Sequence, residues 1–89
     1  MDAKSCEKAT GAIADKYRLS ILLALSKQDT LTPSAIQELT GLSQPCVSHH
    51  VKLLTDSGLV TTTKQGRHLY LQLNRDVVHQ LSTFLAGLI

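Results

Sequence analysis

"TPSAIQELTGLSQPCVSHHVKLL", residues 32–54, contains the start and stop signals of two consecutive helices. Thr32 is placed to cap the first helix, Pro33 suits its first turn, and Gly41 ends it. Ser43 stands at the cap position of the second helix, so a single residue separates the two. Two helices joined by such a tight glycine-containing turn form a helix-turn-helix unit.

Two further helices are predicted before this unit. Residues 4–14 have the apolar spacing of a short helix, and Asp15 can cap a second helix that runs to about Ser26. Apolar side chains surround this second helix almost completely, so we expect it to be central and buried. The residues concerned are Leu19, Ile21, Leu22, Leu23 and Leu25.

The hydrophobic pattern changes from helical to alternating after Gly58. Residues 59–74, "LVTTTKQGRHLYLQLN", are rich in β-branched types and then alternate, with Gln65-Gly66 between the two runs at hairpin spacing. Asn74 can cap a last helix. The sequence therefore predicts one domain over residues 1–89, mainly α with a small β-hairpin. Its order, α-α-α-α-β-β-α, is that of a winged helix-turn-helix.

The second helix of the unit has one face for the core and another for a partner. At about 100° per residue, Val47, Val51 and Leu54 fall on the core face. The predicted DNA-binding residues on the helix are Gln44, Pro45, Ser48, His49 and Lys52. Serine and histidine can bond base edges in the major groove, and lysine can reach a phosphate. Lys64 and Arg67, at the hairpin tip, can neutralise phosphates of a neighbouring groove.

The adjacent His49 and His50 also suggest a metal site or a catalytic pair with Cys46. Adjacent helical residues do not converge on one metal ion, whereas residues four apart do. The catalytic pair lacks a third residue to orient a base. Two alternatives stay open: an ordinary solvated helix face, and a winged helix used only for protein–protein contact. The second alternative requires a more apolar outward face, to which only Leu53 contributes.

The composition suits a small globular protein. The chain has 89 residues, of which 43% are hydrophobic and 3% aromatic, so the core must be aliphatic. The net charge of +2 is weak support for a nucleic-acid partner. Two cysteines are too few for a disulfide framework, and no apolar run approaches membrane-spanning length. We expect a cytoplasmic protein with no membrane partner, and no motif of an enzyme is present.

The last helix predicts self-association. An apolar stripe runs along it to the end of the sequence, and no later segment can cover it. Burial against a symmetry mate is the simplest closed solution, so we expect a homodimer that forms through the terminal helices. The predicted interface residues are Cys6, Ile13, Val77, Leu81, Phe84, Leu85 and Leu88.

The segment "LTGLSQPCVSHHVKLLTDSGLVTTTKQGRHLYLQL" resembles the winged-helix repressors of the ArsR/SmtB type. That family commonly shows "GLSQS-x-VSHHLK-x-L-x-x-AGLV" followed by "R-x-G-R-x-x-Y-x-L". Upstream, "DKYRLSILLAL" is similar to the family's "D-x-x-R-L-x-I-L-x-x-L", so the resemblance covers roughly residues 13–75. It implies a homodimeric transcriptional repressor that binds double-stranded DNA. The helix after Ser43 would be the recognition helix, and the first and last helices would form the dimer interface.

The chain departs from the metal-sensing members of that family. Residues 31–39, "LTPSAIQEL", hold no Cys or His where those members carry a cysteine-rich segment. Asp76 and His79 are spaced differently from the Asp-x-His pair of the other family site. We therefore expect no metal and no cofactor, and interpret His79 as a solvated surface residue.

Cys46 is a candidate redox switch. It lies in the first turn of the predicted recognition helix, beside the DNA-facing residues, where the positive end of the helix dipole favours a thiolate. A bulky or oxidised adduct there would press on the duplex. The alternative interpretation is a small side chain that packs near the start of the helix.

Overall fold

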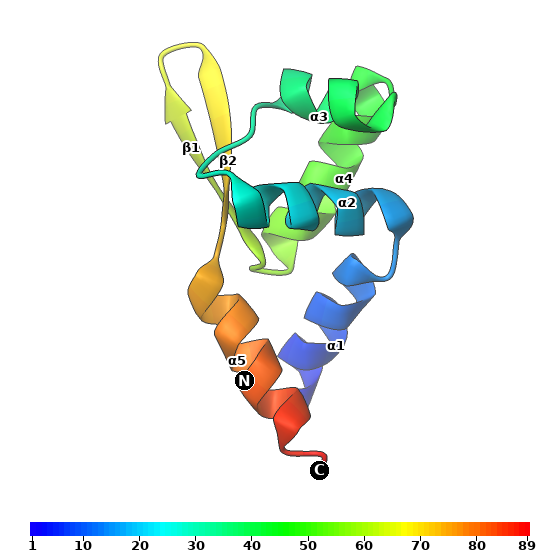
Figure 1. Ribbon diagram of the computed structural model, residues 1–89, viewed down its shortest axis with the longest axis vertical. Helices are drawn as coiled ribbons and strands as arrows, with labels where there is room; N and C mark the ends of the chain where they lie inside the picture. Colours follow the sequence, from blue (N-terminus) through cyan, green and yellow to red (C-terminus); the bar gives the residue numbers. More distant parts are fainter.

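The structure, a computed structural model, describes all of residues 1–89. It contains helices and one two-stranded sheet, in the order that the sequence predicts (Figure 1). In chain order the elements are α1 (Ala3–Ile13), α2 (Lys16–Lys27), α3 (Pro33–Thr40), α4 (Gln44–Asp56), β1 (Val60–Gln65), β2 (His68–Leu73) and α5 (Arg75–Ala86).

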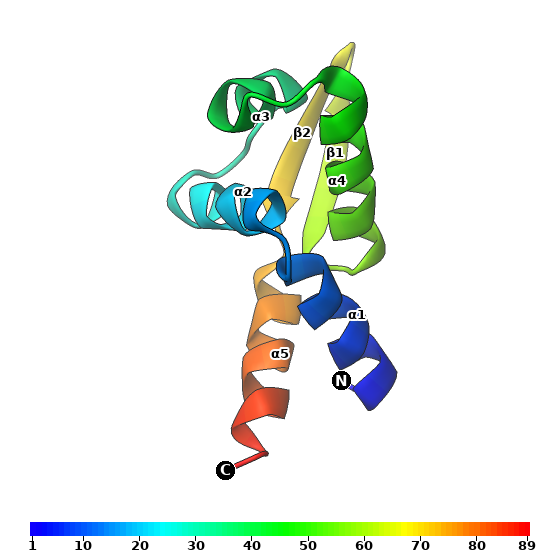
Figure 2. The same ribbon diagram turned by 90° about the vertical axis from the view of Figure 1, so that its right-hand side faces the viewer.

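The molecule is elongated, with extents of 42 × 24 × 21 Å. The helices α2, α3 and α4 and the hairpin of β1 and β2 form its body (Figure 1). The terminal helices α1 and α5 extend away from this body, on the side opposite the tip of the hairpin (Figure 2). Both chain ends therefore lie far from the helix-turn-helix unit.

Side chains cap most of the helices at their N-termini. Asp15, Thr32 and Asn74 accept the backbone bonds that the sequence predicts, and Asp2 does the same for α1. Ser43 occupies the cap position of α4, but its side chain accepts no hydrogen bond, so the predicted side-chain cap is wrong. The first turn of α4 is therefore left without a side-chain acceptor for its N–H groups.

The turn between α3 and α4 depends on Gly41. Its φ of 73° lies in the left-handed region, which a residue without a Cβ enters at little cost. Its N–H donates to Gln37 O at 2.8 Å, which satisfies a carbonyl at the end of α3. The chain can therefore start α4 almost immediately, as the helix-turn-helix prediction requires.

The core is aliphatic and small, as the composition predicts. It contains 14 of the 89 residues, and no polar or charged residue is buried. Every secondary-structure element contributes to it. The buried residues are Cys6, Ala9, Ala12, Ile21, Leu25, Leu31, Ile36, Val47, Val51, Leu54, Leu59, Val60, Leu71 and Leu81.

The prediction that α2 is buried all round is wrong. Ile21 and Leu25 are fully buried, but Leu19 is 42% and Leu23 56% exposed. The body of one protomer packs only against one side of α2, because no element of the chain covers the other side. The apolar side chains on the uncovered side of α2, Leu19 and Leu23, are therefore exposed to solvent in the protomer.

The hairpin is antiparallel and pairs Gln65 with His68. Its two-residue loop is Gly66-Arg67, one position later than predicted, and Arg67 lies in the turn itself. Gly66 has a φ of 61°, which suits the first central position of a hairpin turn. The hairpin is fixed to the body because Leu71 and Leu31 exchange two backbone hydrogen bonds.

Candidate nucleic-acid interface

The helix α4 has the two faces that its sequence predicts. Val47, Val51 and Leu54 are buried in the core. The opposite face is open to solvent along the whole helix and carries no large apolar side chain. Its exposed residues are Gln44, Pro45, Cys46, Ser48, His49, Lys52 and Asp56.

Lys52 has an intramolecular partner on this face. Its Nζ lies 3.0 Å from Asp56 Oδ2, one helical turn later, and both side chains are largely exposed. An ion pair in water of this kind contributes little stability, so its geometry is easily given up. Lys52 is therefore able to turn toward a phosphate without disturbing the fold.

The hairpin flanks the outward face of α4 across a shallow groove. The groove has a volume of about 290 Å³ and combines an apolar floor with hydroxyl and ammonium groups at its rim. It is lined by Pro33, Val47, Ser48, Val51, Lys52, Thr55, Thr62 and Leu69. The outward face of α4 and the wing thus form one continuous surface.

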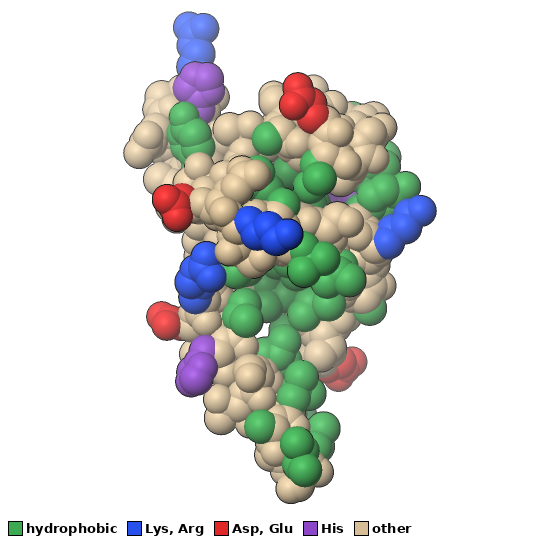
Figure 3. Space-filling view, in the orientation of Figure 1, with side chains coloured by type: hydrophobic (Ala, Val, Ile, Leu, Met, Phe, Trp, Pro, Cys, Tyr) green, Lys and Arg blue, Asp and Glu red, His purple; other side chains and the backbone are tan.

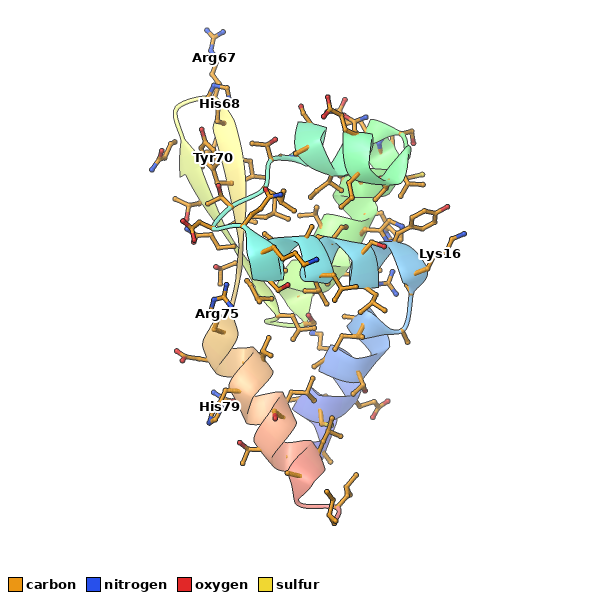
Figure 4. The ribbon with its side chains drawn as sticks, viewed as in Figure 1. Lys16, Arg67, His68, Tyr70, Arg75 and His79 are labelled. Atoms are coloured by element: carbon orange, nitrogen blue, oxygen red, sulfur yellow. The ribbon has the colours of Figure 1, made fainter.

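The wing presents cationic side chains at its far end. Arg67 points away from the body beyond the tip of the hairpin, next to His68 (Figure 4). Lys64 precedes the turn on β1 and is also exposed. Figure 3 shows the cationic tip standing clear of the rest of the surface. The structure therefore leaves both predicted wing residues free to reach a ligand beside α4.

The predicted dimer residues lie on α1, on α5 and, for Leu88, in the turn that follows α5, and they differ in exposure. Cys6 and Leu81 are already buried within the protomer, whereas Leu85 is 40% and Leu88 78% exposed. Ile13, Val77 and Phe84 are half-buried and pack against the core.

The open apolar surface is wider than the sequence predicts. Leu19 and Leu23 of α2 are exposed in addition to Val78, Leu85 and Leu88 of the predicted apolar stripe. Figure 3 shows hydrophobic side chains gathered over α2 and continuing down α5 toward the C-terminus. We call the exposed leucines and valine of α2, of α5 and of the turn after α5 the apolar face; they are Leu19, Leu23, Val78, Leu85 and Leu88.

Sequence reasoning missed the environment of His50. Its side chain is 13% exposed and lies against α2, where Arg18 Nη1 is 3.1 Å from its Nδ1. The pKa of the neighbouring Asp15 is lowered, mainly because the backbone N–H of Arg18 donates to its carboxylate. The charge of Arg18 adds to this effect. Arg18 and His50 are 32 positions apart, so no local pattern could have indicated their contact.

The structure also places the residues of the other hypotheses. His49 is exposed while His50 faces α2, with ring centroids 5.9 Å apart. Cys46 is an exposed free thiol and Cys6 a buried one. His79 is exposed on α5, as predicted (Figure 4). No group of three or more His, Cys, Asp or Glu side chains is placed to hold one metal ion. None of the helices is long and apolar enough to cross a membrane.

The arrangement of α2, α3, α4 and the hairpin defines the protein as a winged helix-turn-helix. The family model described as a helix-turn-helix domain matches residues 13–63. An arsenical resistance operon repressor of Staphylococcus aureus is 36% identical over 81 residues, which cover 91% of this chain and 77% of the repressor. The chain therefore belongs to the ArsR-type family of winged helix-turn-helix transcriptional regulators.

Solved structures show the same fold. The crystal structure of an ArsR family transcriptional regulator superposes with a TM-score of 0.87 at 25% identity, covering 98% of this chain and 89% of that one. The homodimeric winged helix-turn-helix DNA-binding domain of a Mycobacterium bovis protein gives a TM-score of 0.78 at 24% identity. That match covers 94% of this chain and 78% of the Mycobacterium domain.

Proposed function

We propose that the protein is a homodimeric repressor that binds double-stranded DNA in a sequence-specific manner, with α4 as its recognition helix. The observation that carries the proposal is the outward face of α4, where Ser48, His49 and Lys52 are exposed side by side. The opposite face of the helix is buried in the core. A helix held in this way can enter the major groove with its side chains aimed at base edges.

The N-terminus of α4 supports the same assignment. Ser43 does not bond the first-turn N–H groups, so these groups and the positive end of the helix dipole are open to a DNA phosphate. Gln44 lies at the same end, exposed, and can reach a base edge or the backbone. Base contacts and a phosphate contact can therefore be made from one helix end.

The wing supplies a second contact of a different kind. Lys64 and Arg67 are cations on an extended hairpin, which suits phosphates or the minor groove beside the one that α4 occupies. Charge contacts of this type add affinity for any sequence. Sequence preference therefore comes mainly from α4.

The apolar face supports a dimer of this chain. Hydrophobic side chains over α2 and along α5 gather on one face of the molecule (Figure 3), and a second copy can cover them without any other partner. The Mycobacterium bovis domain with the same fold is a homodimer. Cys6, Ile13, Val77, Leu81 and Phe84 would then support the interface from beneath.

The competing assignment as a protein-contact module has lost its one supporting feature. Leu53, the apolar residue expected on the outward side of α4, is half-buried. The exposed side of the helix is otherwise polar. A domain that bound only protein through α4 would need apolar anchors there.

Two parts of the sequence interpretation stay predictions. One is that the protein works without the metal sites of its metal-sensing relatives. The other is a redox switch at Cys46, which as an exposed thiol on α4 is accessible to an oxidant. Equal DNA binding by reduced and peroxide-treated wild-type protein would rule out this switch.

The proposed function is tested with the DNA upstream of the protein's own gene. A gel shift at two salt concentrations should show a specific complex that weakens as salt rises, because phosphate contacts release counterions. A scrambled duplex of the same length is the control. Equal binding of the two duplexes would contradict sequence-specific recognition.

A further inference from the structure

The side chain of Arg18 joins three helices at one point. Its Nε donates to Ala12 O at 2.7 Å, and its Nη2 lies 3.5 Å from Gly11 O, so it satisfies carbonyls in the last turn of α1. Its Nη1 reaches His50 Nδ1 on α4 at 3.1 Å. One guanidinium group on α2 therefore connects α1 directly to α4.

The chemistry of the two side chains fixes the direction of the central bond. A guanidinium group has only donors, so Nδ1 of His50 must accept and the ring proton must lie on Nε2. Asp15 Oδ2 is 3.8 Å from the same Nδ1, which is too long for a hydrogen bond. Asp15 instead accepts the backbone N–H groups of Tyr17 and Arg18 and holds the start of α2 in place.

His50 stands at the boundary between the two faces of α4. Its neighbour His49 is exposed with the DNA-facing residues, and its neighbour Val51 is buried in the core. The core side chains of α4 are aliphatic and make no directional bonds. The Arg18–His50 bond is thus a directional contact that fixes the rotation and position of α4 against α1.

We propose that Arg18 and His50 are positioning residues that set the spacing of the two recognition helices in the dimer and thereby its specificity. This inference rests on the proposed function. In a dimer joined through the terminal helices, the position of α4 relative to α1 determines the distance between the two copies of α4. Paired half-sites lie about one helical turn of DNA apart, near 34 Å, so an α4 whose position varies relative to α1 fits them poorly. Contacts to phosphates are less sensitive to the position of α4.

The DNA arm of the test compares His50→Leu with His50→Asn. Leucine fills the site but cannot accept a bond, whereas the asparagine oxygen can accept from Arg18. On a duplex selected from random sequences by the wild type, His50→Leu should bind about tenfold more weakly, the equivalent of one lost charged hydrogen bond. On a scrambled duplex its affinity should stay within about twofold, since phosphate contacts are intact. His50→Asn should restore most of the specific affinity.

Arg18→Lys is a second variant, which retains the positive charge. Lysine lacks the planar fork that bonds α1 and His50 together. It should therefore lose specific affinity like His50→Leu. Thermal unfolding of each variant separates this loss from a loss of folded protein.

A distance measurement tests the same proposal without DNA. Spin labels are placed on the exposed Cys46 and on α1 through Glu7→Cys, in a Cys6→Ala background diluted with unlabelled protein. The distance distribution between α1 and α4 should be narrow with His50 or Asn at this position and broader or shifted with His50→Leu. An unchanged distribution and unchanged specificity in His50→Leu would overturn the proposal. A wild-type protein that selects no DNA would instead contradict the proposed function, and the distances would still decide whether Arg18 and His50 position α4.

Discussion

The outward side of α4 with the wing and the apolar face expose different kinds of side chain. At the end with the helix-turn-helix unit and the wing, the surface presents serine, histidine, lysine and arginine. At the other end, α1 and α5 extend from the body, and leucines of α5, together with leucines of α2 in the body, face solvent (Figures 1 and 3). Both regions pack on one hydrophobic core.

The difference shows which surface needs a partner. Polar and cationic groups are well solvated, so the DNA-facing end needs no partner in order to stay folded. Exposed leucines are poorly solvated, and burying them lowers the free energy in proportion to the apolar area removed from water. The apolar end therefore depends on a second copy, and the polar end is left free for DNA.

The largest effect is expected at the apolar end. Leu85→Asp would place a carboxylate in each half of a symmetric interface, at a cost on the order of 3 kcal/mol or more. Sedimentation at micromolar concentration should show a dimer for the wild type and a monomer for the variant. Specific DNA binding should fall with it, since two half-sites are no longer held together.

Thr83→Asp is the matched control for this prediction. Thr83 is exposed on the side of α5 away from the apolar stripe, so the same charge should leave the dimer intact. A wild-type protein that sediments as a monomer would contradict the assignment of the apolar face.

At the polar end, the largest effect is expected on α4. Ser48→Ala or His49→Ala should cost on the order of 1–3 kcal/mol of binding to the selected duplex and relax preference at particular base pairs. Their thermal stability should stay close to wild type, because both side chains are exposed. Competition with single-base variants of the duplex measures the preference.

Wing variants should have a smaller and more uniform effect. Lys64→Ala or Arg67→Ala should weaken binding to all sequences and reduce the slope of log affinity against log salt by about one. A loss confined to one sequence would show instead that Arg67 reads a minor groove. Titrations at several salt concentrations on the selected and scrambled duplexes distinguish the two outcomes.

The smallest effect is expected on the unfolding free energy, through the cap that Asp15 forms at the start of α2. Asp15→Ala removes a helix cap and should cost about 1 kcal/mol of unfolding free energy near neutral pH. Because the folded-state pKa of Asp15 is lowered from its ordinary value of 3.8, its contribution is present above that value. The contribution is lost as the pH falls through the lower folded-state pKa.

Denaturant unfolding of Asp15→Ala and wild type between pH 2 and pH 7 measures this difference, with roughly equal stabilities expected at the acidic limit. Asp29→Ala is the control, because it removes an exposed carboxylate that has no hydrogen-bond or ion-pair partner. A difference between Asp15→Ala and wild type that is independent of pH would contradict a role for the charge.

Local signals in the sequence predicted the fold well. Thr32, Pro33 and Gly41 define α3 through caps and a left-handed glycine, which depend only on neighbouring residues. The alternation after Gly58 predicted the wing for the same reason. The error of one residue in the hairpin loop arose because Gly66 can occupy either central position of a two-residue turn, and only the strand register decides which.

Properties that depend on distant packing could not be predicted. The exposure of Leu19 and Leu23 follows from where the other helices lie, and an apolar pattern all round α2 cannot distinguish burial in a protomer from burial in a dimer. The contact of His50 with Arg18 joins residues far apart in the chain. On a helical wheel His50 is an edge residue, and nothing local indicates which group meets it.

The most direct test of the central claim compares the selected duplex with a scrambled one, using wild type and the Ser48→Ala/His49→Ala double variant at one fixed salt concentration. The wild type should prefer the selected duplex by roughly a thousandfold or more, as specific regulators do. The double variant should lose most of that preference while binding the scrambled duplex as the wild type does. If the double variant keeps the full preference, the outward face of α4 does not read DNA sequence and the account is wrong.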